Sequence, residues 1–342
     1  MTNFPLPRID EDEKLRSLLL PYCRIKNGDI WEDPQGKHRI GCCGAEDESE
    51  IKKLMNSEKA VPIGRQASLA IQDPPYNFIA FQEREAESFV NWSKFWIKNS
   101  CECLKEDSSL YIWLGADQNN HFQPFAEFIL MMKDSGFNSR SFITMRNQRG
   151  YGTQKNWMSV RQELLYYIKG NPYYNVNAEY TDIPKILRGY YKEIGGKITE
   201  NSERSKSEFI RAGNVWVDIQ QVFYRMEENI NGCYAQKPLT AIKRIIEASS
   251  RENEIVIDFF AHSGSTLLAC EMLNRKCFTS DNDPVFCEIT LRRLENYRNN
   301  KKTGWQNSNP FAYEILNDEK LKQHLRENYN YDFESYLPLL KL

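Results

Sequence analysis

A short apolar run at residues 69–71 is followed, after one glutamine, by the sequence Asp73-Pro74-Pro75-Tyr76. Proline fixes φ and lacks an N–H, so the chain after Asp73 is stiff and its carbonyl oxygens can accept hydrogen bonds. A carboxylate, a bare carbonyl and an aromatic ring therefore lie within four residues. Together they offer two acceptors for the hydrogens of a planar amine and one face for stacking. The alternative interpretation is a strand followed by a rigid turn.

Segments with strand and helix patterns alternate along most of the chain. The first unit, a strand at 38–43, a helix through Leu54 and the strand at 69–71, is expected to be parallel with a right-handed crossover. Further strands are expected at 109–114, 141–145, 163–168, 254–258 and 276–280, and helices at 13–20, 87–103, 122–135, 240–248, 267–273, 284–296 and 317–328. Trp92 and Trp96, at helical spacing, are expected in the core. The alternation predicts a doubly wound α/β sheet.

Composition limits the classes to which the chain can belong. Its 342 residues, 41% of them hydrophobic, suffice for one large α/β domain with an insertion or for two domains. The net charge of −2 means that a nucleic-acid site needs locally concentrated positive charge. No apolar run approaches the ~20 residues that span a bilayer, and no apolar signal core begins the chain, so we expect a cytoplasmic protein. The nine cysteines include no C-x-x-C pair, which predicts reduced thiols and no metal site.

A second group of residues with chemical potential lies between 254 and 281. A strand ending at Asp258 is followed by a glycine and serine turn, a helix and another strand that ends at Asp281. This order is typical of the nucleotide-binding half of a doubly wound sheet. Gly264 lets the backbone approach a ligand closely, and Asp281 is placed to accept ribose hydroxyls. A dehydrogenase would look similar, but it would want G-x-G-x-x-G, which is absent.

Three motifs together resemble those of amino-group DNA methyltransferases. Asp73-Pro74-Pro75-Tyr76 resembles their catalytic motif, and residues 258–266 resemble their S-adenosylmethionine loop, usually Asp-Pro-Phe-x-Gly-Ser-Gly-Thr-Thr. Gln236-Lys237-Pro238 resembles the motif just upstream of that loop. The catalytic motif precedes the cofactor loop, which is the order of the β-class of this family. The resemblance covers residues 38 to about 300. It implies a doubly wound, Rossmann-like S-adenosylmethionine-dependent methyltransferase fold with an inserted target-recognition segment.

The chain departs from the family pattern at three places. His262 stands at the first glycine of the cofactor loop, so its side chain must point away from the ligand or cover it. Phe259 replaces the usual proline. Ala45 replaces the acid of the usual Cys-Gly-Asp, so that cofactor contact is expected to be missing or to be supplied by Asp47.

The resemblance implies a role for each motif residue. Asp73 and the Pro74 carbonyl would accept the two N6 hydrogens of a flipped-out adenine, and Tyr76 would stack on the base, with Pro75 completing the catalytic motif. Lys237 would neutralise the methionine carboxylate of S-adenosylmethionine, and Asp281 would hold the ribose. The full set of expected cofactor contacts is Lys237, Asp258, Phe260, His262, Ser263, Gly264, Ser265, Thr266 and Asp281.

Two basic, aromatic segments are the candidates for contact with double-stranded DNA. Residues 146–151 form an expected glycine-containing loop, and residues 171–213 interleave tyrosines with lysines and arginines. Cations suit phosphates and rings suit bases. Acidic residues in the second segment also fit an ordinary solvated loop. The expected DNA contacts are Arg146, Arg149, Tyr151, Lys185, Arg188 and Arg204.

These observations divide the chain into an N-terminal extension (1–37), a catalytic half (38–170), a target-recognition insert (171–213), a cofactor-binding half (214–300) and a C-terminal tail (301–342). The expected activity is site-specific adenine-N6 methylation of DNA, as in restriction-modification systems, by a homodimer. Asp at the first motif position is associated with adenine in this family, whereas Ser is more usual for cytosine. Cytosine-N4 methylation, an RNA substrate and a catalytically weak DNA-binding relative stay open as alternatives.

Overall fold

The computed structural model describes residues 6–56, 65–75, 86–115, 122–151, 157, 159–175, 191–200, 213–306 and 308–333. Within these residues, nine strands form one sheet in the order β1-β2-β11-β10-β3-β4-β6-β5-β9. The strands are β1 (Ile30–Glu32), β2 (His38–Cys42), β3 (Ala67–Gln72), β4 (Leu104–Trp113), β5 (Asn138–Tyr151), β6 (Ser159–Lys169), β9 (Val215–Trp216), β10 (Ile255–Asp258) and β11 (Lys276–Asp281). The five from β2 to β4 are parallel, and β1 and β6 flank them antiparallel.

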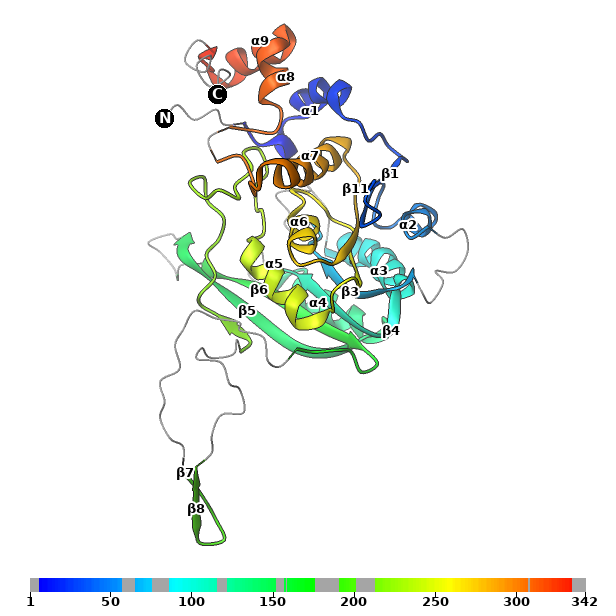
Figure 1. The fold of residues 1–342 in the computed structure, drawn as a ribbon, viewed down its shortest axis with the longest axis vertical. Helices are drawn as coiled ribbons and strands as arrows, with labels where there is room; N and C mark the ends of the chain where they lie inside the picture. Colours follow the sequence, from blue (N-terminus) through cyan, green and yellow to red (C-terminus); the bar gives the residue numbers. More distant parts are fainter. Residues whose placement is uncertain are drawn as a thin grey trace.

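Helices cover both faces of the parallel strands (Figure 1). One face carries α2 (Glu48–Leu54), α3 (Ala86–Cys103) and α4 (Phe125–Met131), and the other carries α5 (Leu239–Ser249), α6 (Ser265–Met272) and α7 (Pro284–Asn300). Strand β3 shows why. Its Leu69 and Ile71 pack with α5 to α7, whereas Ala70 packs with α2 to α4. Because successive side chains of a strand point to opposite faces, a strand between two helical layers is apolar throughout. The predicted doubly wound fold is confirmed.

The strand order could not be read from the local pattern. Strands β2 and β3 are parallel, as the first strand-helix-strand unit predicts, but β11 and β10 lie between them. The predicted loop at 146–151 is wrong. These residues continue β5, which pairs antiparallel with β6 as far as Tyr151 opposite Ser159, with a register shift after Arg146. Gly150 can lie within β5 because glycine is tolerated in a strand where the pairing with the neighbouring strand, here β6, is irregular.

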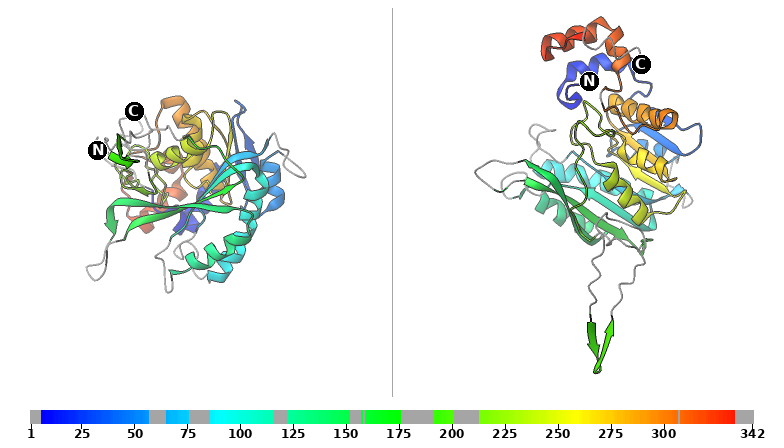
Figure 2. Two further views of the ribbon diagram at one scale, coloured as in Figure 1. Left: turned by 90° about the horizontal axis from the view of Figure 1, so that it is seen from below. Right: turned by 60° about the vertical axis from the view of Figure 1, so that its left-hand side comes forward.

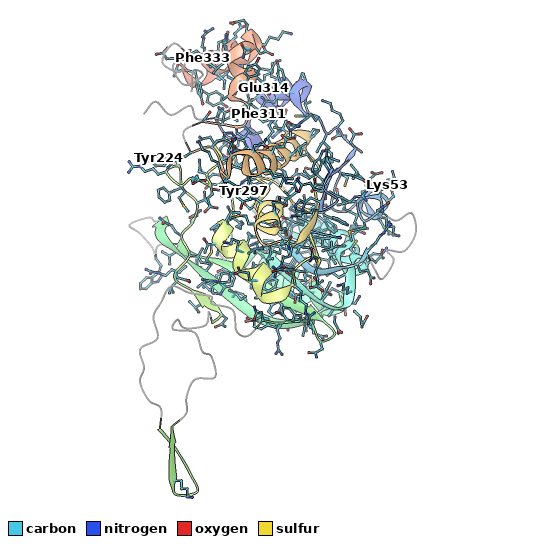
Figure 3. The ribbon with its side chains drawn as sticks, in the orientation of Figure 1. Lys53, Tyr224, Tyr297, Phe311, Glu314 and Phe333 are labelled. Atoms are coloured by element: carbon cyan, nitrogen blue, oxygen red, sulfur yellow. The ribbon has the colours of Figure 1, made fainter. Side chains whose placement is uncertain are left out.

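The two ends of the chain pack together. Helix α1 (Glu13–Leu19), preceded by the 3₁₀ turn Ile9–Glu11, lies against α8 (Ala312–Asn317), α9 (Glu319–Tyr329) and one side of α7. Figures 1 and 3 show this body above the sheet, with Phe311 and Phe333 of its core labelled in Figure 3. Residues of the N-terminal extension and of the C-terminal tail therefore belong to one apolar cluster.

Part of the segment at 171–213 forms a hairpin of its own. Strands β7 (Tyr191–Ile194) and β8 (Lys197–Glu200) pair antiparallel and join no strand of the large sheet. The hairpin lies away from that sheet in Figure 1 and in the right-hand view of Figure 2. In the part of the chain that the structure describes, no helix has the length and apolarity to cross a membrane.

Candidate active site

A cavity of about 750 Å³ opens beside the carboxyl ends of three parallel strands. Its wall includes Asp73, Pro74 and Pro75 after β3, Phe260 and His262 after β10, Asp281 at the end of β11, and Lys237 before α5. Open α/β sheets bind their ligands outside the carboxyl ends of the strands, and this volume lies in the range of small-molecule sites. Residues from the two sequence motifs thus line one cavity.

Strand pairing and one buried glutamine hold the two motifs together. Strands β3 and β10 are neighbours, with Leu69 opposite Val256. Gln72, fully buried at the end of β3, accepts a hydrogen bond from the Phe259 backbone N–H at 2.9 Å. The Gln72 amide also donates to the hydroxyl of Ser100 on α3 at 3.1 Å. The start of the cofactor loop is therefore tied directly to the strand that carries Asp73.

Asp73 forms an ion pair with Lys237. The ammonium Nζ lies 2.8 Å from Asp73 Oδ2, and the side chains of Lys237 and Asp73 are 7% and 27% exposed. Burial raises the pKa of Asp73, and the positive charge of Lys237 opposes that rise. The Lys237 ammonium also lies 5.4 Å from the centre of the Trp113 ring. The structure places Lys237 on the carboxylate of the catalytic motif, a contact that the motif pattern did not predict.

The cofactor loop separates into residues that line the cavity and residues that support them. Phe260 and His262 line it, together with Asp281 beyond the next helix. Asp258 is buried, accepts from the Phe260 N–H at 2.9 Å and bonds the Thr266 side chain. Burial raises the pKa of Asp258 to about 7. The turn residues Ser263, Gly264, Ser265 and Thr266 lie behind the cavity wall. Asp258 and these four turn residues were all expected to contact the cofactor, and in the structure they support the shape of the loop from behind the wall.

His262 adopts a glycine-like backbone conformation. Its φ is +45°, in the left-handed region that histidine enters more readily than most residues. The ring packs 4.8 Å from that of Phe286, and burial lowers the pKa of His262 to about 4. The side chain thus covers part of the wall in its neutral form. Gly264 has φ +71°, and a Cβ there would lie 3.0 Å from the Thr290 Cα.

Asp281 lies at the cavity with its carboxylate already hydrogen-bonded to backbone. Oδ2 accepts from the His262 N–H at 2.8 Å, and Oδ1 accepts from the Asp283 N–H at 3.0 Å. Burial nevertheless raises the pKa of Asp281 to about 7. The carboxylate joins the cofactor loop to the end of β11. Its place at the wall is compatible with accepting hydroxyl hydrogens from a ligand.

Near Ala45, the acid at the cavity is Glu46 and not Asp47. The Asp47 side chain accepts from the backbone N–H groups of Ser49 and Glu50 at 3.0 and 3.1 Å, so it caps α2. Glu46 and Ala45 line the cavity. An N-terminal aspartate satisfies otherwise unpaired N–H groups of a helix, which explains why Asp47 is not available there.

Several cavity residues were missed by the sequence analysis. One side of the cavity is formed by the N-terminal segment, through Arg8, Asp10, Glu13, Arg16, Ser17 and Leu20. No motif marks them, because they reach the site only through the packing of α1. Trp92 was expected in the core beside Trp96. Trp96 is fully buried, but Trp92 lines the cavity and packs against Phe260 with 5.8 Å between ring centroids.

A buried arginine on α7 holds the cofactor loop from behind. Arg293 has no exposed surface and donates from Nη1 to the Ser263 carbonyl at 2.8 Å and to the Ser265 hydroxyl at 3.1 Å. Its other nitrogens donate to the carbonyls of Thr303 and Glu228. Burial lowers the pKa of Arg293 to about 10. The sequence analysis predicted the helix at 284–296 but gave Arg293 no role.

The remaining predicted residues are described only in part. Arg146 is exposed on β5. The backbones of Arg149 and Tyr151 continue that strand, but their side chains lie outside the described residues, as do Tyr76, Lys185, Arg188 and Arg204 in full. Among the described residues, no group of three His, Cys, Asp or Glu side chains is arranged to hold a metal ion.

Comparison with known proteins gives one consistent result. A family model described as DNA methylase matches residues 67–292, which contain the catalytic motif and the cofactor loop. The chain is 26% identical over 251 residues to the type II methyltransferase M.HpaI of Haemophilus parainfluenzae, covering 72% of each. It is 28% identical over 273 residues to the DNA adenine methyltransferase YhdJ of Escherichia coli, covering 75% of this chain and 87% of that protein.

A solved structure shares the fold. The cytosine-N4-specific PvuII DNA methyltransferase has a TM-score of 0.52 with this chain at 14% sequence identity. The match covers 84% of this chain and 99% of that one. At this identity the likeness concerns the fold.

Proposed function

We propose, on the premise that this chain belongs to the DNA methylase family, that it transfers a methyl group from S-adenosylmethionine to N6 of adenine in double-stranded DNA. The observation that carries the proposal is the shared cavity, in which Asp73 and Pro74 face the same space as Phe260, His262 and Asp281. A base-binding edge and a cofactor loop must meet in this way for direct transfer between two ligands.

The residues present suit S-adenosylmethionine. Asp281 offers a carboxylate to ribose hydroxyls, and Phe260 with Trp92 offers aromatic surface. Gly264 keeps the turn behind them compact, since a side chain there would meet Thr290. When bound, the cofactor supplies an activated methyl group.

The chain's own groups would direct the attack. A base inside a duplex is out of reach, so it must be flipped into the cavity. Asp73 and the Pro74 carbonyl would then accept the two amine hydrogens and orient the nitrogen lone pair. Tyr76 would stack on the base, a contact of ~1–3 kcal/mol by analogy with proteins that bind single strands. Catalysis is positioning plus electrostatics, without a nucleophilic cysteine.

Adenine is proposed over cytosine for two reasons. The acid at Asp73 is the residue that this family associates with adenine, and the relative YhdJ is named a DNA adenine methyltransferase. The exocyclic amine of cytosine also has two hydrogens, so the acceptors alone suit either base. Cytosine-N4 methylation is therefore the second candidate, and the PvuII enzyme shows that this fold supports it.

The DNA itself would be held outside the cavity. Exposed Arg146 on β5 and the basic, tyrosine-rich segment at 171–213 are proposed to contact phosphates and bases. Many relatives in the β-class pair as homodimers, and we propose the same assembly here. A solution mass of a 40.2 kDa monomer with and without DNA would contradict it.

Product analysis tests the proposed function. The protein is incubated with S-adenosylmethionine and mixed-sequence duplex DNA, and the DNA is digested to nucleosides for mass spectrometry. N6-methyladenine is expected. N4-methylcytosine without N6-methyladenine would support the second candidate. Methylation of RNA but not of DNA, in a parallel incubation, would assign RNA as the substrate. Absence of both product and calorimetric cofactor binding would leave a DNA-binding relative without activity.

A further inference from the structure

Lys237 physically links the two halves of the site. It follows Gln236 in the motif upstream of the cofactor loop, yet its ammonium lies 2.8 Å from Oδ2 of Asp73 in the catalytic motif. The family resemblance assigns this lysine to the methionine carboxylate, whereas the observed pair gives it a partner on the side where the base would enter.

We propose that Lys237 is a positioning residue for Asp73, holding the carboxylate ionised and oriented so that it accepts a hydrogen of the target amine. The inference rests on the proposed methyl transfer, because it concerns the acceptor of that reaction. The ion pair uses Oδ2, so the amine hydrogen would be accepted by Oδ1.

The backbone around Lys237 is fixed on both sides. Gln236 is buried, accepts from the Ile230 N–H at 3.1 Å and donates to the Glu228 carbonyl at 2.7 Å. The Lys237 carbonyl accepts from the Ser265 hydroxyl at 3.1 Å. The side chain then passes the ring of Trp113. A lysine held at its backbone and along its stem can deliver its charge to one place with little loss of side-chain entropy.

Among the described residues that line the cavity, the cations Arg8 and Arg16 pair with acids of the wall other than Asp73, namely Asp10 and Asp283. Lys237 is the cation that pairs with Asp73. Glu46 and Asp281 line the same cavity, and Asp258 is close enough for Asp73 to raise its pKa. His262 also lines the cavity but is held neutral near pH 7 by burial. Burial raises the pKa of Asp73 itself, and Lys237 is the group that lowers it. A protonated carboxyl would carry an O–H donor and present it to the amine hydrogens.

The exposed fractions of the two side chains agree with the proposal that Asp73 meets the base and Lys237 supports Asp73. The Asp73 side chain is 27% exposed and the Lys237 side chain 7%. A base that enters the cavity would therefore meet the carboxylate more readily than the ammonium. A lysine whose main task was to hold a ligand carboxylate would gain from the opposite arrangement, because its donors would then face the ligand.

Two variants separate the roles. Lys237→Met keeps most of the length and apolar stem but removes the charge, and Lys237→Arg keeps the charge. The measurements are the cofactor Kd by calorimetry and the pH profile of kcat at saturating cofactor and DNA. Lys237→Met is expected to lower kcat at neutral pH about 100-fold. In the same variant, the acidic limb of the pH profile of kcat should move to higher pH by about one unit or more. The cofactor Kd should stay nearly unchanged. Lys237→Arg should restore part of kcat and move the limb back.

The opposite split would overturn the proposal. A large rise in cofactor Kd with an unmoved acidic limb would assign Lys237 to the methionine carboxylate. A wild-type protein that binds cofactor but transfers no methyl group would instead defeat the proposed function, and with it the catalytic role given to the pair.

A stability cycle tests the pair whether or not the variants retain activity. Removing one partner of a buried pair leaves an uncompensated charge, whereas removing both is far less costly. At pH 8, Lys237→Met is expected to lower the melting temperature, and the double variant with Asp73→Asn is expected to recover much of it. Additive effects of the two substitutions would show that the residues do not interact and would overturn the proposal.

Discussion

Asp12 and His324, which lie 312 positions apart, are joined by a contact of 2.7 Å between the carboxylate Oδ2 and the imidazole Nε2. The same oxygen accepts from the Tyr329 hydroxyl at 2.8 Å, and Oδ1 caps α1 by accepting from the Leu15 N–H at 2.8 Å. Helix α9 therefore anchors the N-terminal segment that forms one side of the cavity.

Removing this anchor should loosen that side of the cavity. Asp12→Ala deletes the helix cap and leaves His324 and Tyr329 without their shared acceptor, so we expect a loss of about 1–3 kcal/mol in unfolding free energy. The cofactor Kd should rise as well. Urea unfolding and calorimetry measure the two effects. Glu319→Gln, at an exposed acid of α9, should change neither the unfolding free energy nor the cofactor Kd. An unchanged cofactor Kd in Asp12→Ala would show that the N-terminal side does not contribute to binding.

Arg293 should be irreplaceable by lysine. A lysine ammonium cannot reproduce four donations to Ser263, Ser265, Thr303 and Glu228 from one planar group. Arg293→Lys is expected to cost about 2–4 kcal/mol of stability, since buried carbonyls would lose their donors. Cofactor affinity should fall with it. The neighbouring Arg292→Lys is the control. Arg292 donates to the carbonyls of Pro310 and Tyr22, but its partly exposed charge also pairs with two carboxylates that a lysine can still reach, so this substitution should cost less. Equal losses would contradict the special role of Arg293.

The two left-handed positions of the cofactor loop should respond in opposite ways. Gly264→Ala places a methyl group 3.0 Å from the Thr290 backbone at φ +71°, so it should lower stability and cofactor affinity, by at least the ~1–2 kcal/mol of the conformation itself. His262→Gly relieves the same conformational cost at φ +45° and should retain methyl transfer. Thermal melting and transfer assays check both. Loss of transfer in His262→Gly, with the fold intact, would give the imidazole a direct role.

Asp281 should make the cofactor-free protein less stable as pH rises. Its pKa is about 7 when folded, against an ordinary value of 3.8. Below pH 4 both states bind the proton, so the stabilisation is fully present, and it is lost as pH rises towards 7 because only the unfolded carboxyl ionises early. Asp281→Asn should remove part of this slope and raise stability at pH 8 by on the order of 1–3 kcal/mol, while weakening cofactor binding. A slope unchanged from the wild type would refute this assignment.

Local pattern was sufficient to predict the five parallel strands, most of the described helices and the carboxyl-end acids of the site. Asp73 and Asp281 end buried apolar strands, and such ends lie at one edge of a parallel sheet. The pairing of β3 with β10 could not be derived this way, because the contact from Gln72 to Phe259 spans 187 positions. Nothing near Lys237 indicates which carboxylate it meets, since that depends on the path of its side chain past Trp113.

The helix expected at 13–20 was the only feature predicted for the N-terminal side of the cavity, and nothing indicated that this segment would reach the site. Residues 8–20 carry no motif, and they reach the site because Leu15 and Leu19 pack with α7 and α9 in one apolar cluster. The extension of β5 through Gly150 likewise depends on its partner strand rather than on its own residues. Tertiary packing decided both outcomes.

The most direct test of the central claim is to measure cofactor binding and methyl transfer together in Asp73→Ala. If the two motifs form one site in which Asp73 receives the target amine, transfer to DNA should be abolished. Calorimetric binding of S-adenosylmethionine should remain close to that of the wild type. Methyl transfer that survives the substitution would contradict the role of this carboxylate, and with it the account of the site.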